Sequence, residues 1–424
     1  MRLVLASAVL SACTNAPCEP HTFDDAPAAG PGEVRHGFAV GNATDLVATP
    51  SGVACLSCDT IFYFDGALHE ERHVGVDLDG TGKIAVTSHA AIVFDQDYSP
   101  EYDTFDDSYR PPHFQLFALS GSGEELWRKD FADGEAWTGN FPPVGLNGPR
   151  QVTPSVVAGP DVVIVYGIPL ASVFDAASGR LEWATLTQQG DALAADANTG
   201  LFHASGSVAG RPPQATLRHF GIDGGTAWTT TWSPVEPPLG FGEITFRGVA
   251  RTANDGLVVA GDFTTPTLDL GGHVLQSPTG PVGPNGASFV AALDARGATL
   301  WAFAVGTAVG TNDRSGYVQI RKIAATRDGA MICGEYAGAG QLGLPDTDRS
   351  IRAFVARVDA SGVITAYPIV GSSVSCQGLA VADDGGAIVM IQSNSSLGST
   401  AIRVGSRTFD HGPDTTFYVL NISL

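Results

Sequence analysis

Apolar and polar residues alternate between Arg247 and Gly306 in a pattern that predicts two β-hairpins. Each half has two short runs in which every second residue is apolar, which is the period of a strand with one buried face. Turn sequences separate the runs, Asn254-Asp255-Gly256 in the first half and Asp294-Ala295-Arg296-Gly297 in the second. Two successive hairpins form a four-stranded antiparallel sheet, which is the unit of a β-propeller.

Similar units recur along the whole chain. The first hairpin of the unit occurs seven times, at 46–56, 84–94, 152–166, 192–205, 249–261, 323–335 and 379–392. The second hairpin occurs six times, at 61–75, 116–131, 172–186, 217–232, 289–306 and 354–371, and a single strand follows at the C-terminus. The repeats predict an all-β protein with seven blades, the last of which lacks its outer strand.

The N-terminal region contains a match to the missing strand. Residues 36–41 read HGFAVG and resemble residues 301–306, WAFAVG, which form the predicted outer strand of another unit. We therefore expect residues 36–40 to complete the last blade. Residues 36–424 are then one seven-bladed β-propeller closed by an N-terminal strand in the last blade, and closure removes two sheet edges that would be open to other chains.

The repeats resemble those of two groups of propellers. The second hairpin carries apolar residues followed by a turn with Asp and Gly and then a tryptophan, as in Asp294, Gly297 and Trp301, which is similar to the repeats of pyrroloquinoline-quinone (PQQ-like) propellers. The units from Val249 onward, with Gly261-Asp262-Phe263 and Leu268-Asp269-Leu270-Gly271-Gly272, resemble the repeat propellers of exported myxobacterial proteins. These resemblances imply the fold rather than an activity. PQQ is not expected as a cofactor, because the adjacent cysteine pair of the quinone dehydrogenases is missing.

Composition narrows the choice of partners. The chain has 52 glycines and 26 prolines, which supply turns, and a formal net charge of -21 at pH 7. An acidic surface repels phosphate backbones, so we expect no nucleic-acid partner. We expect a monomer. Four tryptophans fall in predicted outer strands, where we expect them to pack between neighbouring blades: Trp127, Trp183, Trp228 and Trp301.

The N-terminus has the features of a bacterial export signal. Arg2 precedes an apolar run, and Leu10-Ser11-Ala12-Cys13 resembles the lipobox of bacterial lipoproteins. The resemblance implies a signal peptide at residues 1–12, an acylated Cys13, and a flexible tether at residues 13–35 that is rich in Pro, Ala and acidic residues. The threonine after Cys13 implies the outer membrane. The alternatives are an ordinary secretory signal and a wrongly assigned start.

Five cysteines remain if Cys13 is acylated. Because an exported protein meets an oxidising compartment, Cys333 with Cys376 and Cys55 with Cys58 are the candidate disulfides. Spacing alone leaves both pairings open. We do not interpret Cys55 and Cys58 as a redox site, because no helix pattern follows them.

His69-Glu70-Glu71-Arg72-His73 matches the H-E-x-x-H motif of zinc peptidases, in which two histidines bind the metal and the first glutamate is the general base. That chemistry needs a helix, on which residues four apart share one face. Here the motif falls in a predicted strand, and four residues along a strand span about 13 Å. We therefore interpret it as a polar outer strand, and a zinc peptidase is the alternative.

The segment 95–109 is acidic and aromatic. Its carboxylates stand at positions that resemble the start of an EF-hand loop: Asp95, Asp97, Glu101, Asp103 and Asp106. Pro100 stands where that loop needs glycine, and no flanking helices are predicted. Two interpretations stay open, a calcium site of another kind and a solvated acidic loop.

Loops that join strands two and three of a blade, and loops between blades, emerge at the same end of a propeller. The long predicted loops belong to these two classes and carry aromatic candidates for partner binding: Tyr98, Tyr102, Trp137, Phe141 and Phe241. The alternative is that each ring anchors its own loop.

We interpret the protein as a non-catalytic exported lipoprotein. It would be a propeller scaffold that binds a protein or glycan partner at the cell envelope, held in the outer membrane through Cys13, with no cofactor unless the acidic segment binds calcium. The sequence has no Gly-x-Ser-x-Gly elbow and no phosphate-binding loop. The alternatives are an envelope hydrolase or lyase with a site built from loops of several blades, and the zinc peptidase at His69 and His73.

Overall fold

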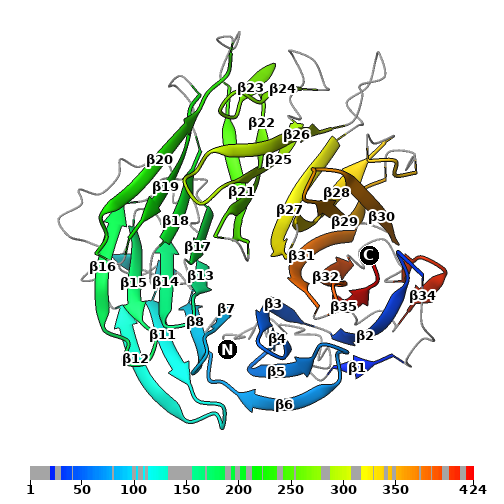
Figure 1. The fold of residues 1–424 in the computed structure, drawn as a ribbon. Coiled ribbons are helices and arrows are strands. Elements are labelled where there is room, and N and C mark those ends of the chain that lie inside the picture. The colour runs from blue at the N-terminus through cyan, green and yellow to red at the C-terminus, as the bar shows by residue number, and fades with distance from the viewer. Residues whose placement is uncertain are drawn as a thin grey trace, which may run out of the picture.

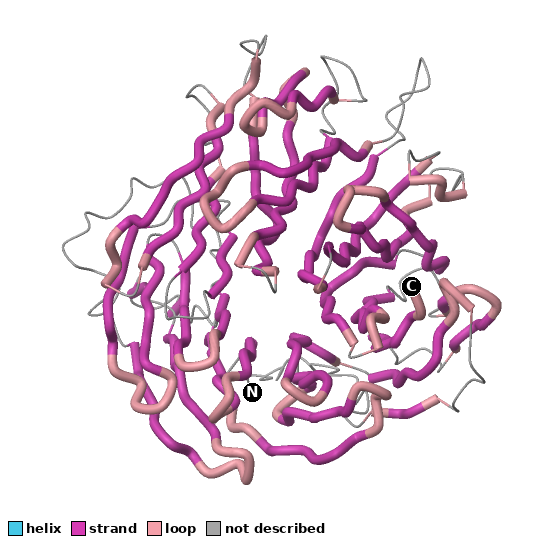
Figure 2. The backbone as a smooth tube through the Cα atoms, in the orientation of Figure 1, coloured by secondary structure: helices cyan, strands magenta, loops and turns pink. Residues whose placement is uncertain are grey.

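The structure is a computed structural model. All the regular secondary structure of the described residues is β-strand (Figure 2). It describes residues 20–23, 30–40, 42–78, 81–97, 102–103, 108–109, 113–131, 155–167, 170–186, 192–195, 201–206, 213–221, 223–235, 242–252, 255–277, 287–306, 317–327, 329–338, 342–345, 350–371, 374–382, 384–393, 401–410 and 417–424. Among these residues there is no helix with the length and hydropathy to cross a membrane.

Seven sheets stand around a central axis, so the predicted seven-bladed β-propeller is confirmed (Figure 1). Blade 1 contains β3 (Ala43–Thr49), β4 (Gly52–Ser57), β5 (Thr60–Asp65) and β6 (Glu70–Gly75). Blade 2 contains β7 (Thr81–Val86), β8 (Ala91–Asp97), β11 (His113–Leu119) and β12 (Glu125–Phe131). Blade 3 contains β13 (Ser155–Ala158), β14 (Val162–Gly167), β15 (Leu170–Asp175) and β16 (Leu181–Leu186). Blade 4 contains β17 (Ala192–Ala195), β18 (Leu201–Ser205), β19 (Ala215–Phe220) and β20 (Thr226–Trp232).

Blade 5 also has four strands, and the sheets of blades 6 and 7 have additional ones. Blade 5 contains β21 (Ile244–Arg251), β22 (Leu257–Phe263), β25 (Ala287–Leu293) and β26 (Thr299–Val305). Blade 6 contains β27 (Tyr317–Thr326), β28 (Gly329–Ala337), β29 (Arg352–Asp359), β30 (Ile364–Gly371), β33 (Ile402–Val404) and β34 (Arg407–Phe409). Blade 7 contains β31 (Val374–Val381), β32 (Ala387–Ser393), β35 (Phe417–Ile422), β2 (Val34–Val40) and β1 (His21–Thr22). Two short pairs stand apart, β9 (Tyr102–Asp103) with β10 (Ser108–Tyr109), and β23 (Thr267–Asp269) with β24 (Val274–Gln276).

The N-terminal strand completes the last blade, as the sequence predicts. β2 pairs antiparallel with β35, and Phe38 lies opposite Val419. In Figure 1 the blue strand β2 lies beside the red strand β35, although they come from opposite ends of the chain. The strand could be found from its match to residues 301–306, because both segments form the fourth strand of a blade and need the same alternation of apolar residues.

The chain ends also rebuild the tight turn that the other blades have between their third and fourth strands. In blade 5 the N–H of Asp294 donates to the carbonyl of Ala298, and the N–H of Gly297 donates to the carbonyl of Asp294. In blade 7 the N–H of Ser423 donates to the carbonyl of Glu33, and the N–H of Gly32 donates to the carbonyl of Ser423. The same two bonds therefore form across a gap in the covalent chain.

The described part of the predicted 13–35 tether belongs to the propeller, which corrects the predicted boundary at residue 36. β1 pairs with β2 in the register His21 opposite Ala39, and β2 itself begins at Val34. The ring of Phe23 lies 4.7 Å from that of Phe409. These residues carry the apolar side chains that a solvated tether lacks, so they bury surface instead of remaining free.

Two hairpins from neighbouring blades cover exposed sheet edges. β33 and β34, which lie between β32 and β35 in the chain, pair back onto β30 at the outer edge of blade 6. β23 and β24 of blade 5 reach blade 4, where Asp269 bridges Ser233. Leu268, Ile402 and Val404 in these hairpins are fully buried. An uncovered outer strand would offer unpaired backbone groups to other chains, and these hairpins prevent that.

Seven apolar clusters form the core, and each lies at one seam between neighbouring blades. Aromatic side chains on outer strands close several of these seams by lying over a turn glycine of the next blade. A Cβ atom added to Gly179 would come within 2.6 Å of the Trp127 ring, and one added to Gly297 within 2.7 Å of the Trp228 ring. Tyr367 covers Gly32 in the rebuilt turn in the same way. The tryptophans therefore pack between blades, as expected from their positions.

An acidic side chain caps several of these turns. Asp294 Oδ1 accepts hydrogen bonds from the N–H groups of Arg296 and Ala298, each at 2.9 Å. In blade 3 the Ser178 hydroxyl and N–H donate to Asp175, and these bonds hold the pKa of Asp175 below its usual value despite partial desolvation. A lowered pKa means that this carboxylate stabilises the fold at neutral pH, and the contribution is lost as the pH falls below 3.8.

We predict that Gly297→Ala destabilises the protein more than Gly385→Ala. Both glycines have the same left-handed backbone, with φ of 82° and 81°, but a Cβ at Gly385 meets nothing within 4 Å. The control therefore carries only the backbone cost of about 1–2 kcal/mol, and Gly297→Ala adds about 1–3 kcal/mol for displacing Trp228. Denaturant unfolding of both variants measures the difference, and equal losses would show that the tryptophan contact is unimportant.

Candidate functional site

The two ends of the propeller differ in the length of their connections. Because neighbouring strands are antiparallel, the turns after the first and third strands of each blade lie at one end, which we call the turn end. The connections after the second strand, and those between blades, lie at the other end, which we call the loop end. The turn end has short connections, such as Thr49 to Gly52 and Asp294 to Thr299. The long connections predicted as partner-binding loops all lie at the loop end.

Four innermost strands carry a β-bulge at the same position near the loop end. The pairing register shifts at Thr44 in β3, at Arg247 in β21, at Arg321 in β27 and at Gln377 in β31. A bulge adds one residue to one strand and redirects its side chain. We call these four residues the bulge belt, and they belong to blades 1, 5, 6 and 7.

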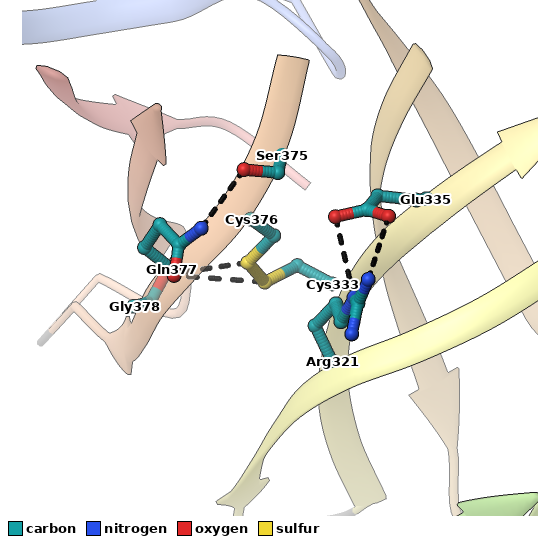
Figure 3. Close-up of a disulfide and its surroundings, with 7 residues drawn as sticks. All are labelled: Arg321, Cys333, Glu335, Ser375, Cys376, Gln377 and Gly378. Carbon is teal, nitrogen blue, oxygen red and sulfur yellow. Dashed lines mark hydrogen bonds and ion pairs between the residues drawn. A yellow bond between two sulfur atoms is a disulfide. The ribbon is translucent and has the colours of Figure 1, made fainter. Parts of the chain in front are cut away.

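The long side chains of the belt bind polar residues on the second strand of their own blade. Arg321 forms two hydrogen bonds to Glu335, Nε to Oε1 at 3.2 Å and Nη2 to Oε2 at 3.0 Å. Arg247 Nε lies 2.6 Å from Asp262 Oδ2, and Gln377 Nε2 donates to Gln392 at 3.0 Å. Figure 3 shows Arg321 and Glu335 facing each other, with Gln377 on the other side of the Cys333–Cys376 disulfide. A forked pair of this kind fixes the orientation of both groups.

Asp262 extends this arrangement from blade 5 into blade 6. Its Oδ1 accepts a hydrogen bond from the Ser288 hydroxyl at 2.6 Å, and its Oδ2 accepts one from Gln319 Nε2 at 3.3 Å. The buried Ser288 oxygen lies 3.1 Å from the carbonyl of Val318 and 3.2 Å from the N–H of Ile320 in β27. The first strand of blade 6 is therefore bonded to blade 5 at the loop end.

A disulfide reinforces the next seam. Cys333 of β28 is bonded to Cys376 of β31, so blades 6 and 7 are covalently joined beside the belt (Figure 3). This is one of the two pairs considered from the sequence. The other pair does not form, because Cys55 is a free, buried thiol. Cys58 is in a disulfide whose partner lies outside the described residues.

Charged side chains follow the belt at the next position of the innermost strands. Asp45 of β3, Lys83 of β7 and Lys322 of β27 occupy this level. Asp45 Oδ2 accepts the N–H of Ile84 at 3.0 Å, and Lys83 Nζ donates to the carbonyl of Thr44 at 2.8 Å. Desolvation lowers the pKa of Lys322, the charge of Asp45 opposes that shift, and the charge of Lys83 adds to it. The level therefore holds two cations and one anion.

The H-E-x-x-H residues lie in and just before a strand. β6 comprises Glu70–Gly75, and it is the outer strand of blade 1. His69 Nδ1 is 3.2 Å from Asp65 Oδ2, and His73 Nδ1 is 2.9 Å from Glu70 Oε1. In a zinc peptidase this glutamate acts as the general base, but here it contacts the second histidine. The geometry is that of a charged outer strand, and such charges protect a sheet edge from pairing.

Most of the predicted calcium and partner-binding residues lie outside the described residues. This holds for Tyr98, Glu101, Asp106, Trp137, Phe141 and Phe241. The backbones of Asp97, Tyr102 and Asp103 are described as strand, and Asp95 is buried in β8 with 2% of its surface exposed. Within the part of the chain that the structure describes, no three His, Cys, Asp or Glu side chains are grouped as metal ligands.

Reasoning from the sequence did not find the bulge belt. Arg247, Arg321 and Gln377 occupy the same place in three successive repeats, each one residue before Gly248, Lys322 or Gly378. An alignment of the repeats by position, instead of by turn motif, would have shown a polar residue recurring inside an apolar strand.

Comparisons with known proteins add only structural likenesses. No protein-family model and no curated protein matches the sequence. BamB from Moraxella catarrhalis is 14% identical with a TM-score of 0.40, covering 89% of this chain and 93% of that one. Hsv2 from Kluyveromyces lactis is 9% identical with a TM-score of 0.46, covering 90% and 98%. Virginiamycin B lyase from Staphylococcus aureus is 10% identical with a TM-score of 0.46, covering 90% and 95%. Likeness at this level carries no argument about activity.

We predict that Cys55 resists alkylation in the folded protein. Burial, with a smaller contribution from Asp45, raises the pKa of this thiol to about 12, so the reactive thiolate is scarce at pH 8. Iodoacetamide at pH 8 should leave Cys55 unmodified in the native state and label it fully in guanidinium without reductant, as peptide mass mapping would show. Absence of labelling in guanidinium would indicate that Cys55 is bonded, and rapid native labelling would contradict its burial.

Proposed function

We propose that this protein is a non-catalytic scaffold of the cell envelope, anchored in the outer membrane by a lipid on Cys13, which binds a protein partner at its loop end. The bulge belt is the observation that supports the partner site. It places Arg247, Arg321 and Gln377 around the axis at the end of the ring that carries the long connections.

The rigidity of this end favours binding over chemistry. Each long belt side chain is held by a residue of its own blade, and blades 5 to 7 are joined there by Ser288 and by the Cys333–Cys376 disulfide. Loops that begin on a rigid support bind a partner with little loss of conformational entropy. The arginines already have carboxylate partners, so they orient a surface without offering a free acid, base or nucleophile.

The anchoring part of the proposal is supported by the lipobox-like sequence before Cys13. A single acyl chain gives weak membrane binding, and stable anchoring needs more than one. In the bacterial lipoproteins that residues 10–13 resemble, the cysteine is acylated on both its amine and its thiol, so it carries more than one acyl chain. β1 pairs with β2 at the outer edge of blade 7, so the proposed anchor would join the propeller at that edge.

The first test concerns the anchor. We predict that Cys13→Ser moves the protein from the membrane fraction to the soluble envelope fraction, because the variant has no thiol to acylate. Cys18→Ser is the matched control, since it removes a cysteine five residues away and should leave the protein in the membrane. Fractionation with metabolic labelling by a fatty acid measures both. A Cys13→Ser protein that stays in the membrane and keeps its label would contradict lipid anchoring at this residue.

The second test concerns the partner. We predict that a photo-crosslinking amino acid at Asn42 or Glu243, both exposed at the loop end, captures the same protein in intact cells. The control positions, Ser122 and Ser361, are exposed in turns at the opposite end and should capture nothing in common with them. Equal capture from both ends, or capture from the turn end alone, would contradict the proposed face. A product sensitive to glycosidase and resistant to protease would identify a glycan instead.

A further inference from the structure

The seam between blades 5 and 6 differs at the turn end from two other seams, in which a tryptophan donates a hydrogen bond to the next blade. Between blades 2 and 3, Trp127 Nε1 donates to the carbonyl of Ala176 at 2.9 Å. Between blades 4 and 5, Trp228 Nε1 donates to the carbonyl of Ala295 at 3.1 Å. In both cases the acceptor is the second residue of the tight turn, which follows the turn aspartate. The indole therefore joins one blade to the next.

Trp301 occupies the same position in blade 5, but it does not make this bond. Its Nε1 has no hydrogen bond to any described residue. Ala360, the equivalent acceptor in blade 6, lines the same cavity as Trp301, which is described below. A Cβ at Gly362 would lie 3.5 Å from the Trp301 ring, compared with 2.6 and 2.7 Å for the two seams above. Trp183, between blades 3 and 4, likewise has no hydrogen-bond partner for Nε1 among the described residues, but its ring would lie 3.2 Å from a Cβ at Gly224. The indole of Trp301 is therefore the farthest of the four from the neighbouring blade, and the seam is wider at this end.

A cavity of about 460 Å³ fills the opening, which is within the range of small-molecule sites. Its inner wall includes Val258 and Ala292, whose side chains belong to the core between blades 5 and 6. Trp301 forms one wall, and Leu300, 60% exposed, lies at the rim. An exposed leucine beside a half-buried indole is a surface that an apolar group would cover with a gain in free energy.

Two arginines give the rim a positive charge. Arg296 comes from the tight turn of blade 5 and Arg327 from the first turn of blade 6, and both side chains are exposed. Neither forms an ion pair with a described carboxylate. Asp294 also lines the cavity, but its Oδ1 already accepts two N–H groups of its own turn. With Asp294 counted, the charged residues of the lining still carry one net positive charge in a chain of net charge -21, and neither arginine is paired with a described carboxylate, which favours an anion at the rim.

We propose that the open seam between blades 5 and 6 binds a small apolar carboxylate. Its aromatic or branched aliphatic group packs against Trp301 and Leu300, and its carboxylate lies between Arg296 and Arg327. The Nε1 of Trp301 and the carbonyl of Ala360 supply one donor and one acceptor for a polar group between these two parts, such as an amide. This site is at the turn end and is separate from the proposed partner face.

The test uses N-acetyl-L-phenylalanine as the probe, because it combines a ring, an amide and a carboxylate within the volume of the cavity. Titration calorimetry on the full-length protein should give a dissociation constant on the order of 10⁻³ M, as expected for a ligand of this size. The amide of the same compound, which lacks the negative charge, should bind about tenfold more weakly. Equal binding of acid and amide would overturn the assignment of the arginines.

Variants locate the site. Arg296→Ala and Arg327→Ala should each weaken binding of the acid about tenfold and leave binding of the amide unchanged. Ala360→Phe, at an exposed position in the cavity wall, should abolish binding of both by filling the space. Arg180→Ala is the matched control, because Arg180 is an exposed turn-end arginine of blade 3, and it should have no effect. Thermal unfolding of each variant checks that the fold is intact.

Two further probes distinguish the sources of such a ligand. 3-Phenylpropionate represents a free small acid, and an octapeptide ending in phenylalanine represents the carboxyl end of a polypeptide. Tighter binding of the first than of the second supports a free acid, and the reverse order supports a chain end. Failure of all three carboxylates to bind, or binding unchanged in Ala360→Phe, would refute the site. Either result leaves the tests of Cys13 and of the loop end unaffected.

Discussion

The pairing of β2 with β35 is the interaction on which the rest of the molecule depends. A blade buries its two faces only against its neighbours, so a ring with one unfinished blade would lose two seams at once. β2 contributes to both: Val34 and Ala39 lie in the core between blades 6 and 7, and Phe38 and Val40 in the core between blades 7 and 1. The chain ends meet inside a turn whose backbone hydrogen bonds are otherwise those of the continuous turns. Hydrogen bonds between Ser423 and residues 32–33 therefore hold the two segments together where the other blades have a continuous backbone.

The blades next to this junction hold most of the additional reinforcement. The Cys333–Cys376 disulfide joins blades 6 and 7, and the hairpin of β33 and β34 leaves blade 7 to extend blade 6. At the seam of blades 7 and 1, Asn421 donates to the carbonyl of Gly66 at 2.9 Å. A crosslink beside a non-covalent closure limits how far the ring can open when the N-terminal strand separates, since both neighbours of blade 7 remain attached to it.

The sequence predicted what is repeated and local, and failed where the structure depends on packing between distant residues. Alternation and Asp-x-x-Gly turns predicted the blades, and residues 36–40 were placed correctly because their side chains repeat those of 301–305. The bulges were not predicted, because Arg247 and Arg321 each occupy an extra position that interrupts the alternation used to find strands. Spacing could not show that Cys55 and Cys58 do not form a disulfide with each other. Cys55 lies within β4 with its thiol in the core, whereas Cys58 lies in the turn after that strand.

The two ends of the seam between blades 5 and 6 differ: the blades are bonded to each other at the loop end and stand apart at the turn end. At the loop end, Ser288 and Asp262 bond to Val318, Gln319 and Ile320, so the two blades are held at a fixed separation there. At the turn end the indole of Trp301 makes no corresponding bond. Blade 6 cannot tilt toward Trp301 without stretching the bonds at the other end, so the cavity is preformed and remains open without a ligand. An unfilled cavity costs stability, and this seam retains one although the rings of Trp127 and Trp228 close two other seams tightly over a glycine. A ligand that fills it recovers that free energy without first having to separate the blades.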